Sequence, residues 1–142
     1  MPMVKEYNLE FKGYYREVNK TSLPEQAGVY CVYTCKYNPT EKSVENLFLI
    51  YIGESENINE RHKDENHEHY KDFKSYLESG ETLCYSYALV PNDEDRKRCE
   101  AALIYEMQPP INEQSTETFN YPKTHITTSG RNSKLVKDFI VE

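Results

Sequence analysis

The sequence predicts a single domain of the α/β (α+β) class, with a small central sheet flanked by helices. Three runs rich in β-branched and aromatic residues predict strands, at residues 29–35, 47–52 and 82–90. Three further segments carry helical periodicity or helix-capping residues, at 57–61, 70–77 and 92–108. A chain of 142 residues has room for one hydrophobic core and, by default, one site.

The first two strands are expected to pair as an antiparallel hairpin. Between them, residues 36–46 form a polar segment with turn residues such as Asn38 and Pro39, which predicts a rather long tip. Gly53 ends the second strand, where glycine allows a sharp exit of the chain. Before the hairpin, alternation over residues 7–11 suits a short strand or an extended arm on the core.

Asn57 is the expected N-cap of the first helix. Glu60 follows three residues later, as in a capping box, and this places Arg61 one turn along the helix. The longest helix is capped by Asn92 or Asp93. The adjacent prolines Pro109 and Pro110 end that helix.

Beyond the long helix, residues 124–128 and 135–141 are expected to add strands or a short helix. On the helix itself, stepping back from the apolar Leu103 and Ile104 by helical spacing places Glu100 on the core-facing stripe. A carboxylate buried there needs a cation, either an arginine or a metal ion. The alternative is a glutamate at the edge of the stripe whose tip reaches water.

The net charge of −7 argues against a protein that coats nucleic acid through bulk electrostatics. A local basic strip is sufficient for contact with a phosphate backbone, whatever the charge elsewhere. The candidate strips are Lys12 with Arg16 and Lys20, then residues 96–98, and finally Lys123 with Arg131, Lys134 and Lys137. Each is alternatively a solvated face.

The cysteines and the hydropathy exclude other classes of protein. Four scattered cysteines without a C-x-x-C pair support neither a zinc knuckle nor a disulfide framework, and buried thiols are expected. No stretch approaches the length of a membrane span, and residues 1–6 lack the basic and apolar regions of a secretory signal. We therefore expect a cytoplasmic protein without membrane partners.

The order of six elements along the chain is its most informative feature. These elements are Gly28-Val29-Tyr30, Tyr51-Ile52-Gly53, Arg61, a histidine, Glu100 before Ala-Ala-Leu-Ile, and Asn112 after Pro-Pro-Ile. In this order they resemble the GIY-YIG nuclease family, over about residues 24–113. The resemblance implies a central, mostly antiparallel three-stranded sheet flanked by helices. Residues 1–23 would then be an N-terminal arm and residues 114–142 a C-terminal extension.

The resemblance also implies a metal-dependent endonuclease that hydrolyses phosphodiester bonds in DNA. Tyr30 or Tyr51 would activate the attacking water, and Arg61 would hold the scissile phosphate. Glu100 would be the protein ligand of Mg²⁺ or Mn²⁺, and Mg²⁺ accepts oxygen ligands and retains a water-rich shell. Gly53 would lie at the substrate, and Asn112 would brace the site by hydrogen bonding.

The histidine of this pattern is displaced. Members of the family typically carry it one helical turn after the arginine, where this chain has Glu65. We choose His67, because it precedes the helix over residues 70–77 much as the family histidine precedes an aromatic-bearing helix; His62 and His69 are its rivals. Such a histidine would accept or relay a proton near neutral pH.

A different class of function is the main alternative. The acidity of the chain, the displaced histidine and Glu54 directly after Gly53 also suit a catalytically degenerate module that binds nucleic acid or a protein partner. Because the chain carries no added DNA-binding module, we expect either weak intrinsic sequence selectivity in DNA or selectivity supplied by a homodimer or a partner protein.

Overall fold

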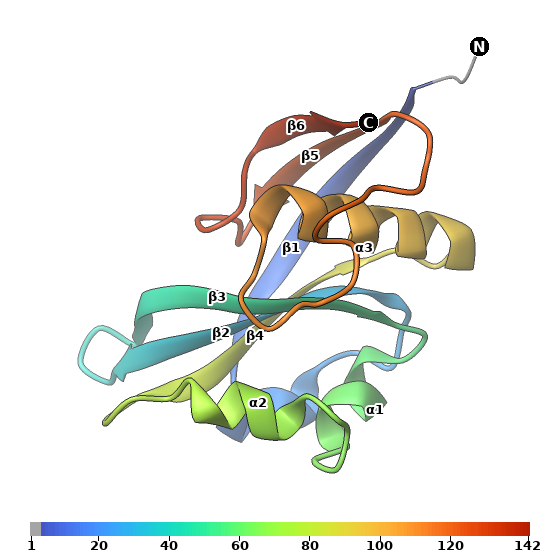
Figure 1. Ribbon diagram of the computed structural model, residues 1–142. Coiled ribbons are helices and arrows are strands. Elements are labelled where there is room, and N and C mark those ends of the chain that lie inside the picture. Colours follow the sequence, from blue (N-terminus) through green and yellow to red (C-terminus); the bar gives the residue numbers. More distant parts are fainter. Residues whose placement is uncertain (1–3) are drawn as a thin grey trace.

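The computed structural model describes residues 4–142, and the first three residues of the expected N-terminal arm lie outside the described residues. Within this range the elements follow in the order β1 (Lys5–Arg16), η1 (Glu17–Ser22), β2 (Gly28–Asn38), β3 (Ser43–Ser55), α1 (Ile58–Lys63), α2 (Tyr70–Ser75), β4 (Thr82–Leu89), α3 (Asp93–Met107), β5 (Thr124–Gly130) and β6 (Asp138–Val141). Figure 1 shows their arrangement.

The strands form one six-stranded mixed sheet in the order β3-β2-β4-β1-β5-β6, so the expected three-stranded sheet is wrong. The three expected strands are adjacent and antiparallel as β3-β2-β4. The sheet continues because β1 pairs antiparallel with β4 and parallel with β5, whose other edge pairs with β6. These strands satisfy backbone N–H and C=O groups that a sheet ending at β4 would leave unpaired.

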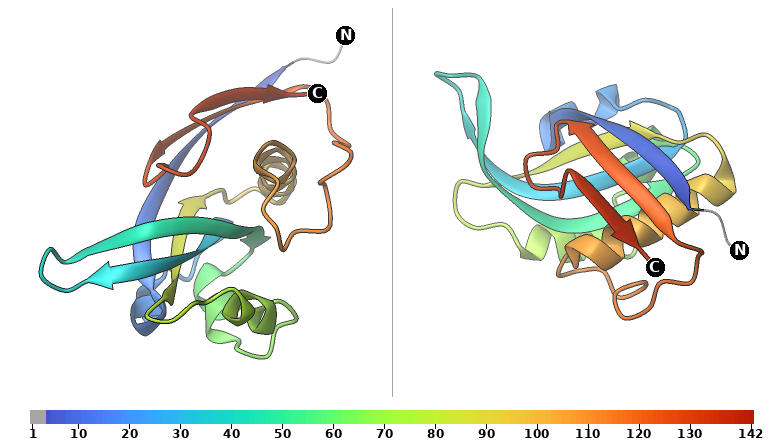
Figure 2. Two further views of the ribbon diagram at one scale, coloured as in Figure 1. Left: turned by 60° about the vertical axis from the view of Figure 1, so that its left-hand side comes forward. Right: turned by 90° about the horizontal axis from the view of Figure 1, so that it is seen from above.

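The sheet curls around α3 (Figure 2, left). Cys99, Leu103 and Ile104 of α3 belong to the larger core cluster, which lines the hollow of the sheet. The opposite face is covered by α1 and α2, whose Ile58 and Phe73 belong to a second cluster. The protein therefore has two layers of core, one on each face of the sheet.

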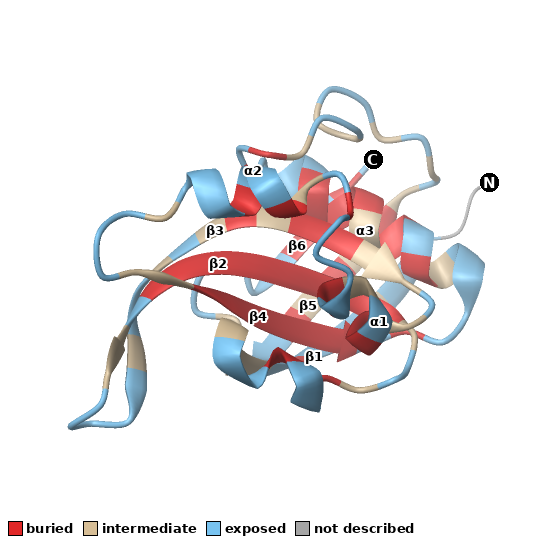
Figure 3. Cartoon of the chain, turned by 90° about the horizontal axis from the view of Figure 1, so that it is seen from below, coloured by how far each residue is buried: buried red, intermediate tan, exposed pale blue. Residues whose placement is uncertain are grey.

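Strand β2 is the most buried strand of this arrangement, and its residues 28–35 are all buried (Figure 3). Such a strand reads as a continuous apolar run, because both of its faces meet core. Val29 and Cys31 point to the α3 layer, whereas Tyr30 and Val32 point to the layer of α1 and α2. This alternation determines which layer receives the Tyr30 hydroxyl.

The hairpin of β2 and β3 is longer than expected, and its tip is shorter. The strands extend to Asn38 and from Ser43, which leaves residues 39–42 as the tip. The side-chain oxygen of Asn38 accepts hydrogen bonds from the backbone N–H groups of Thr40 and Glu41, at 3.0 and 3.1 Å. This Asx turn closes the hairpin early.

The helix caps follow the sequence closely. Asn57 is confirmed as the N-cap of α1, and its side chain accepts a hydrogen bond from the Glu60 N–H at 3.1 Å. Asn92 caps α3 in the same way, accepting from the Asp95 N–H at 2.9 Å. Gln108 ends α3 in the left-handed conformation. These caps fix the positions of Arg61 and Glu100 along their helices.

Candidate active site at the β3 edge

Tyr30, Tyr51 and Arg61 meet in the layer beneath α1. The Arg61 Nε donates a hydrogen bond to the Tyr30 hydroxyl at 3.2 Å, and the rings of Tyr30 and Tyr51 lie 6.2 Å apart between centroids. Tyr30 is 1% exposed, whereas Tyr51 and Arg61 are half-buried. Burial is the main cause that raises the pKa of both tyrosines above 10. Both hydroxyls are therefore neutral hydrogen-bonding groups at neutral pH.

Gly53 sets the position of the Tyr30 ring. It pairs with Tyr30 across the two strands and lies inside β3, which runs on to Ser55, so it does not end the strand as expected. A Cβ atom at Gly53 would lie 2.5 Å from the Tyr30 Cζ and Oη atoms and 2.9 Å from Cε2 of Tyr51. The absence of a side chain leaves room for both rings.

Asn112 is held against the exposed edge of β3. Its side-chain oxygen accepts a hydrogen bond from the Ile52 N–H at 2.9 Å, and its side-chain nitrogen donates to the Ile52 carbonyl at 2.8 Å. The backbone N–H of Ile111 donates to the Ile50 carbonyl at 3.1 Å. The segment after α3 is thus bound to β3 beside Tyr51.

Glu100 is a half-buried carboxylate of α3 with a raised pKa. Burial is the main cause, the nearby Glu54 carboxylate adds to it, and together they raise the pKa of Glu100 to about 7. Glu54 itself pairs with Arg96, whose Nε donates at 2.6 Å and whose side chain is 2% exposed. Among residues 4–142, no lysine or arginine forms an ion pair with Glu100.

A pocket of about 200 Å³ joins Tyr51, Glu100 and Asn112, but not Tyr30 or Arg61, where the two layers meet at the β3 edge. It is lined by Tyr51, Glu68, His69, Glu100, Ile104, Asn112, Glu113 and Gln114. A second hollow of about 480 Å³ shares Glu100 and Gln114 with it and extends toward Glu54 and Lys97. Glu100 therefore lies at the junction of two hollows, with carboxylate and amide oxygens around it.

The three candidate histidines differ in position. His62 is 2% exposed, packs between the rings of Tyr30 and Tyr85, and has its pKa lowered to about 3, mainly by burial. His67 is also buried and packs on Phe73, with its pKa lowered to about 4 by burial first and the Arg61 cation second.

His69 occupies a different environment from the other two. Its ring lies 4.8 Å from the Tyr51 ring between centroids, and it lines the pocket together with Glu100. The carboxylates of Glu68 and Asp72 lie 3.5 Å from its two ring nitrogens. His69 therefore faces the pocket, whereas the expected His67 packs within the second core cluster's aromatic side chains.

The structure thus brings together Tyr30, Tyr51, Arg61, Glu100 and Asn112 with the space left by Gly53. Sequence reasoning gave no role to Glu68 and Glu113, which also line the pocket. The only signal for them in the sequence is that Glu68 directly follows His67 and Glu113 directly follows Asn112.

Among residues 4–142, no helix has both the length and the apolar character needed to cross a membrane. In the same part of the chain, no group of three or more His, Cys, Asp or Glu side chains is arranged to hold a metal ion. Comparison with models of known protein families, with curated proteins and with solved structures gave no match.

Proposed function

We propose that this protein is a metal-dependent endonuclease of the GIY-YIG type, which hydrolyses phosphodiester bonds in DNA. The observation that carries the proposal is the convergence of residues distant in sequence. Arg61 bonds to the Tyr30 hydroxyl, and Tyr51, Glu100 and Asn112 line one pocket beside them. A phosphate at this edge would meet a cation, hydroxyl groups and a carboxylate within one small region.

The residues around Glu100 fit a hard divalent cation. A carboxylate whose pKa is about 7 is poorly compensated by its own protein, and a cation would relieve this cost. Glu100 would be the single protein ligand, and a small hard cation that keeps most of its waters suits such a site. When bound, such an ion polarises a phosphoryl oxygen and stabilises the leaving oxyanion.

Arg61 is suited to hold the scissile phosphate. Its guanidinium is half-buried and directed by Tyr30, and among residues 4–142 it forms no ion pair with a carboxylate. A positioned guanidinium binds phosphate through two parallel N–H bonds and remains charged throughout the reaction. Its charge would stabilise the negative charge that develops on the phosphate.

His69 and Tyr51 are suited to position and deprotonate the attacking water. The raised pKa of Tyr51 makes its hydroxyl a donor that orients the water rather than a base. Imidazole is the side chain best matched to proton transfer near neutral pH, and that of His69 is the one beside Tyr51 in the pocket. We therefore give the proton-accepting role to His69 in place of His67.

A non-catalytic module that binds nucleic acid or a protein is the second candidate. The observation in its favour is the acidity of the pocket, which Glu68, Glu100 and Glu113 line together. Without a cation these carboxylates repel a phosphate, which argues against a scissile phosphate in this pocket.

Nicking of supercoiled plasmid DNA with Mg²⁺ separates the two functions. Wild type should cut, and Glu100→Gln should lose about 100-fold or more of the rate, the scale expected when a charge-stabilising group is removed. Glu113→Gln, which removes the same charge from an exposed residue of the same pocket, should stay within a few-fold. Equal rates for wild type and Glu100→Gln would refute the nuclease, and binding of DNA without cleavage by wild type would favour the non-catalytic module.

A further inference from the structure

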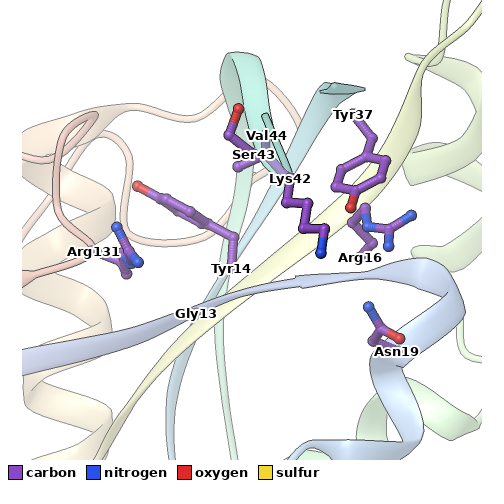
Figure 4. A pocket seen from close by; sticks show the side chains of 9 residues that line it. All are labelled: Gly13, Tyr14, Arg16, Asn19, Tyr37, Lys42, Ser43, Val44 and Arg131. Carbon is purple, nitrogen blue, oxygen red and sulfur yellow. The ribbon is translucent and has the colours of Figure 1, made fainter. Parts of the chain in front are cut away.

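A further hollow, of about 400 Å³, lies away from the candidate active site, at the other end of the β2–β3 hairpin (Figure 4). Three cationic side chains line it: Arg16 at the end of β1, Lys42 at the hairpin tip and Arg131 directly after β5. None of its nine lining residues is acidic, although the chain has 24 acidic and 17 basic residues. The fold thus concentrates positive charge in this hollow, although the chain as a whole is acidic.

The same charge continues along β1. A neighbouring hollow of about 390 Å³ shares Gly13 and Arg131 with the first and adds Lys12, again without an acidic lining residue. We call the two hollows the basic groove, defined by Lys12, Arg16, Lys42 and Arg131. Among residues 4–142, none of these four side chains forms an ion pair. An anion would therefore not have to displace a carboxylate.

Tyrosine rings hold the two arginines in place. The Arg16 guanidinium carbon lies 3.6 Å from the centroid of the Tyr37 ring, and that of Arg131 lies 5.9 Å from the centroid of the Tyr14 ring. At the shorter distance the Tyr37 ring stacks on the flat guanidinium of Arg16, which orients it and leaves its N–H edge free for an oxyanion. Arg131 lies at a longer, cation–π distance from Tyr14.

From this geometry we infer that the basic groove binds the phosphate backbone of a nucleic-acid strand, without reading its bases. Four cations spread over two adjoining hollows suit several phosphates in succession better than one small anion. Two of them are guanidinium groups, whose fork matches phosphate oxygens. Contacts to phosphate oxygens carry no sequence information, so binding in the groove would not depend on the bases.

The groove lies far from the candidate active site. Tyr30 and Tyr37 are seven positions apart on β2, which amounts to about 23 Å at the usual strand rise. A strand long enough to reach both places would be held at two points. This anchoring role rests on the proposed nuclease function, whereas binding in the groove does not.

Fluorescence anisotropy with a short labelled DNA strand, in EDTA to prevent cleavage, tests the inference on the full chain. Arg16→Gln with Arg131→Gln should weaken binding about tenfold or more. The slope of log K against log salt should fall by about 1.4, as expected when two contacts to a single strand are lost. Lys42→Gln alone, at the exposed hairpin tip, should give a smaller loss in the same direction and needs no change in the sheet.

The matched control is Lys71→Gln with Lys74→Gln, which removes the same number of charges from two exposed residues of α2, outside the groove. An equal loss in this control, an unchanged affinity in the groove variants, or no binding by wild type at low salt would overturn the inference. Competition by poly-glutamate as effective as that by unlabelled DNA would also overturn it. Groove-dependent binding of DNA with an intact plasmid would uphold the groove and refute the nuclease, whereas cutting with an unchanged affinity in the groove variants would do the reverse.

Discussion

The side chain of Asn112 forms two hydrogen bonds with the backbone of one residue, Ile52 of β3, accepting from its N–H and donating to its carbonyl. An edge strand exposes such groups to any pairing partner. The amide of Asn112 imitates one residue of a neighbouring strand at this point. It closes the edge beside Tyr51 without adding a strand that would cover the pocket.

Replacing Asn112 should therefore loosen both the edge and the site. Asn112→Ala leaves the Ile52 N–H and carbonyl without these partners, and the free energy of unfolding should fall by about 1–3 kcal/mol. Chemical denaturation measures this change. Asn120→Ala, at an exposed position in the same loop between α3 and β5, should change stability by less than about 0.5 kcal/mol. Equal effects of the two substitutions would argue against a bracing role.

Gly53→Ala tests the steric relationship with Tyr30. The new Cβ would lie 2.5 Å from the Tyr30 hydroxyl oxygen, and the ring is buried too tightly to move away. Overpacking of this kind costs about 1–3 kcal/mol, so the melting temperature should fall. Gly80→Asn is the control, because nothing lies within 4 Å of that site and asparagine tolerates its positive φ. A melting temperature unchanged by Gly53→Ala would show that Tyr30 has free space.

Local pattern predicted the strands next to the site but not the size of the sheet. Residues 29–35, 47–52 and 82–90 carry their own β-forming composition, and they lie in β2, β3 and β4 except for Val90, which follows β4. The parallel pairing of β1 with β5 joins Lys5 to Thr124, 119 residues apart, and nothing local encodes such a partner. The alternation over residues 7–11 suits an extended arm as well as a strand. The segment becomes a strand because the edge of β4 is open to pair with it.

The residues of the candidate site could be predicted where one helix determines their position. They could not be predicted where a loop determines it. Glu100 follows from helical spacing on α3, and Arg61 follows from the Asn57 cap. The histidine depends on the turns over residues 64–69, where the His67 N–H donates to the Asp64 carbonyl and the Tyr70 N–H to the His67 carbonyl. These turns direct the His67 ring onto Phe73. No periodicity in the sequence predicts this contact.

Glu100 should make stability depend on pH. Its folded-state pKa of about 7 lies above its ordinary value of 4.5, so the folded state holds more protons between those values. The contribution of Glu100 to the free energy of unfolding therefore falls as pH rises through this window, and the cost is complete above about pH 7. Glu100→Gln removes this cost and should stabilise the metal-free protein by about 1–3 kcal/mol near pH 8, with little gain near pH 4.5. Denaturation at both pH values measures the difference.

The same variant tests the cation without any assay of activity. Addition of Mg²⁺ or Mn²⁺ near pH 8 should raise the melting temperature of wild type but not that of Glu100→Gln, because a ligand stabilises only the state that binds it. The shift should shrink below about pH 7, where a proton competes for the carboxylate. Glu113→Gln should keep most of the shift. A metal-induced shift of the same size in Glu100→Gln would remove Glu100 as the ligand.

Substitutions of His69 and His67 should have different effects on kcat. His69 lines the pocket beside Tyr51, so His69→Gln should lower kcat by about 100-fold or more, the scale of a lost general base, while the protein remains folded. His67→Gln disturbs packing on Phe73 and should lower the melting temperature with a much smaller effect on kcat. Nicking rates and thermal melts of both variants provide the comparison. A loss of kcat in His67→Gln together with full activity in His69→Gln would contradict the assignment to His69 and would return the proton-accepting role to His67.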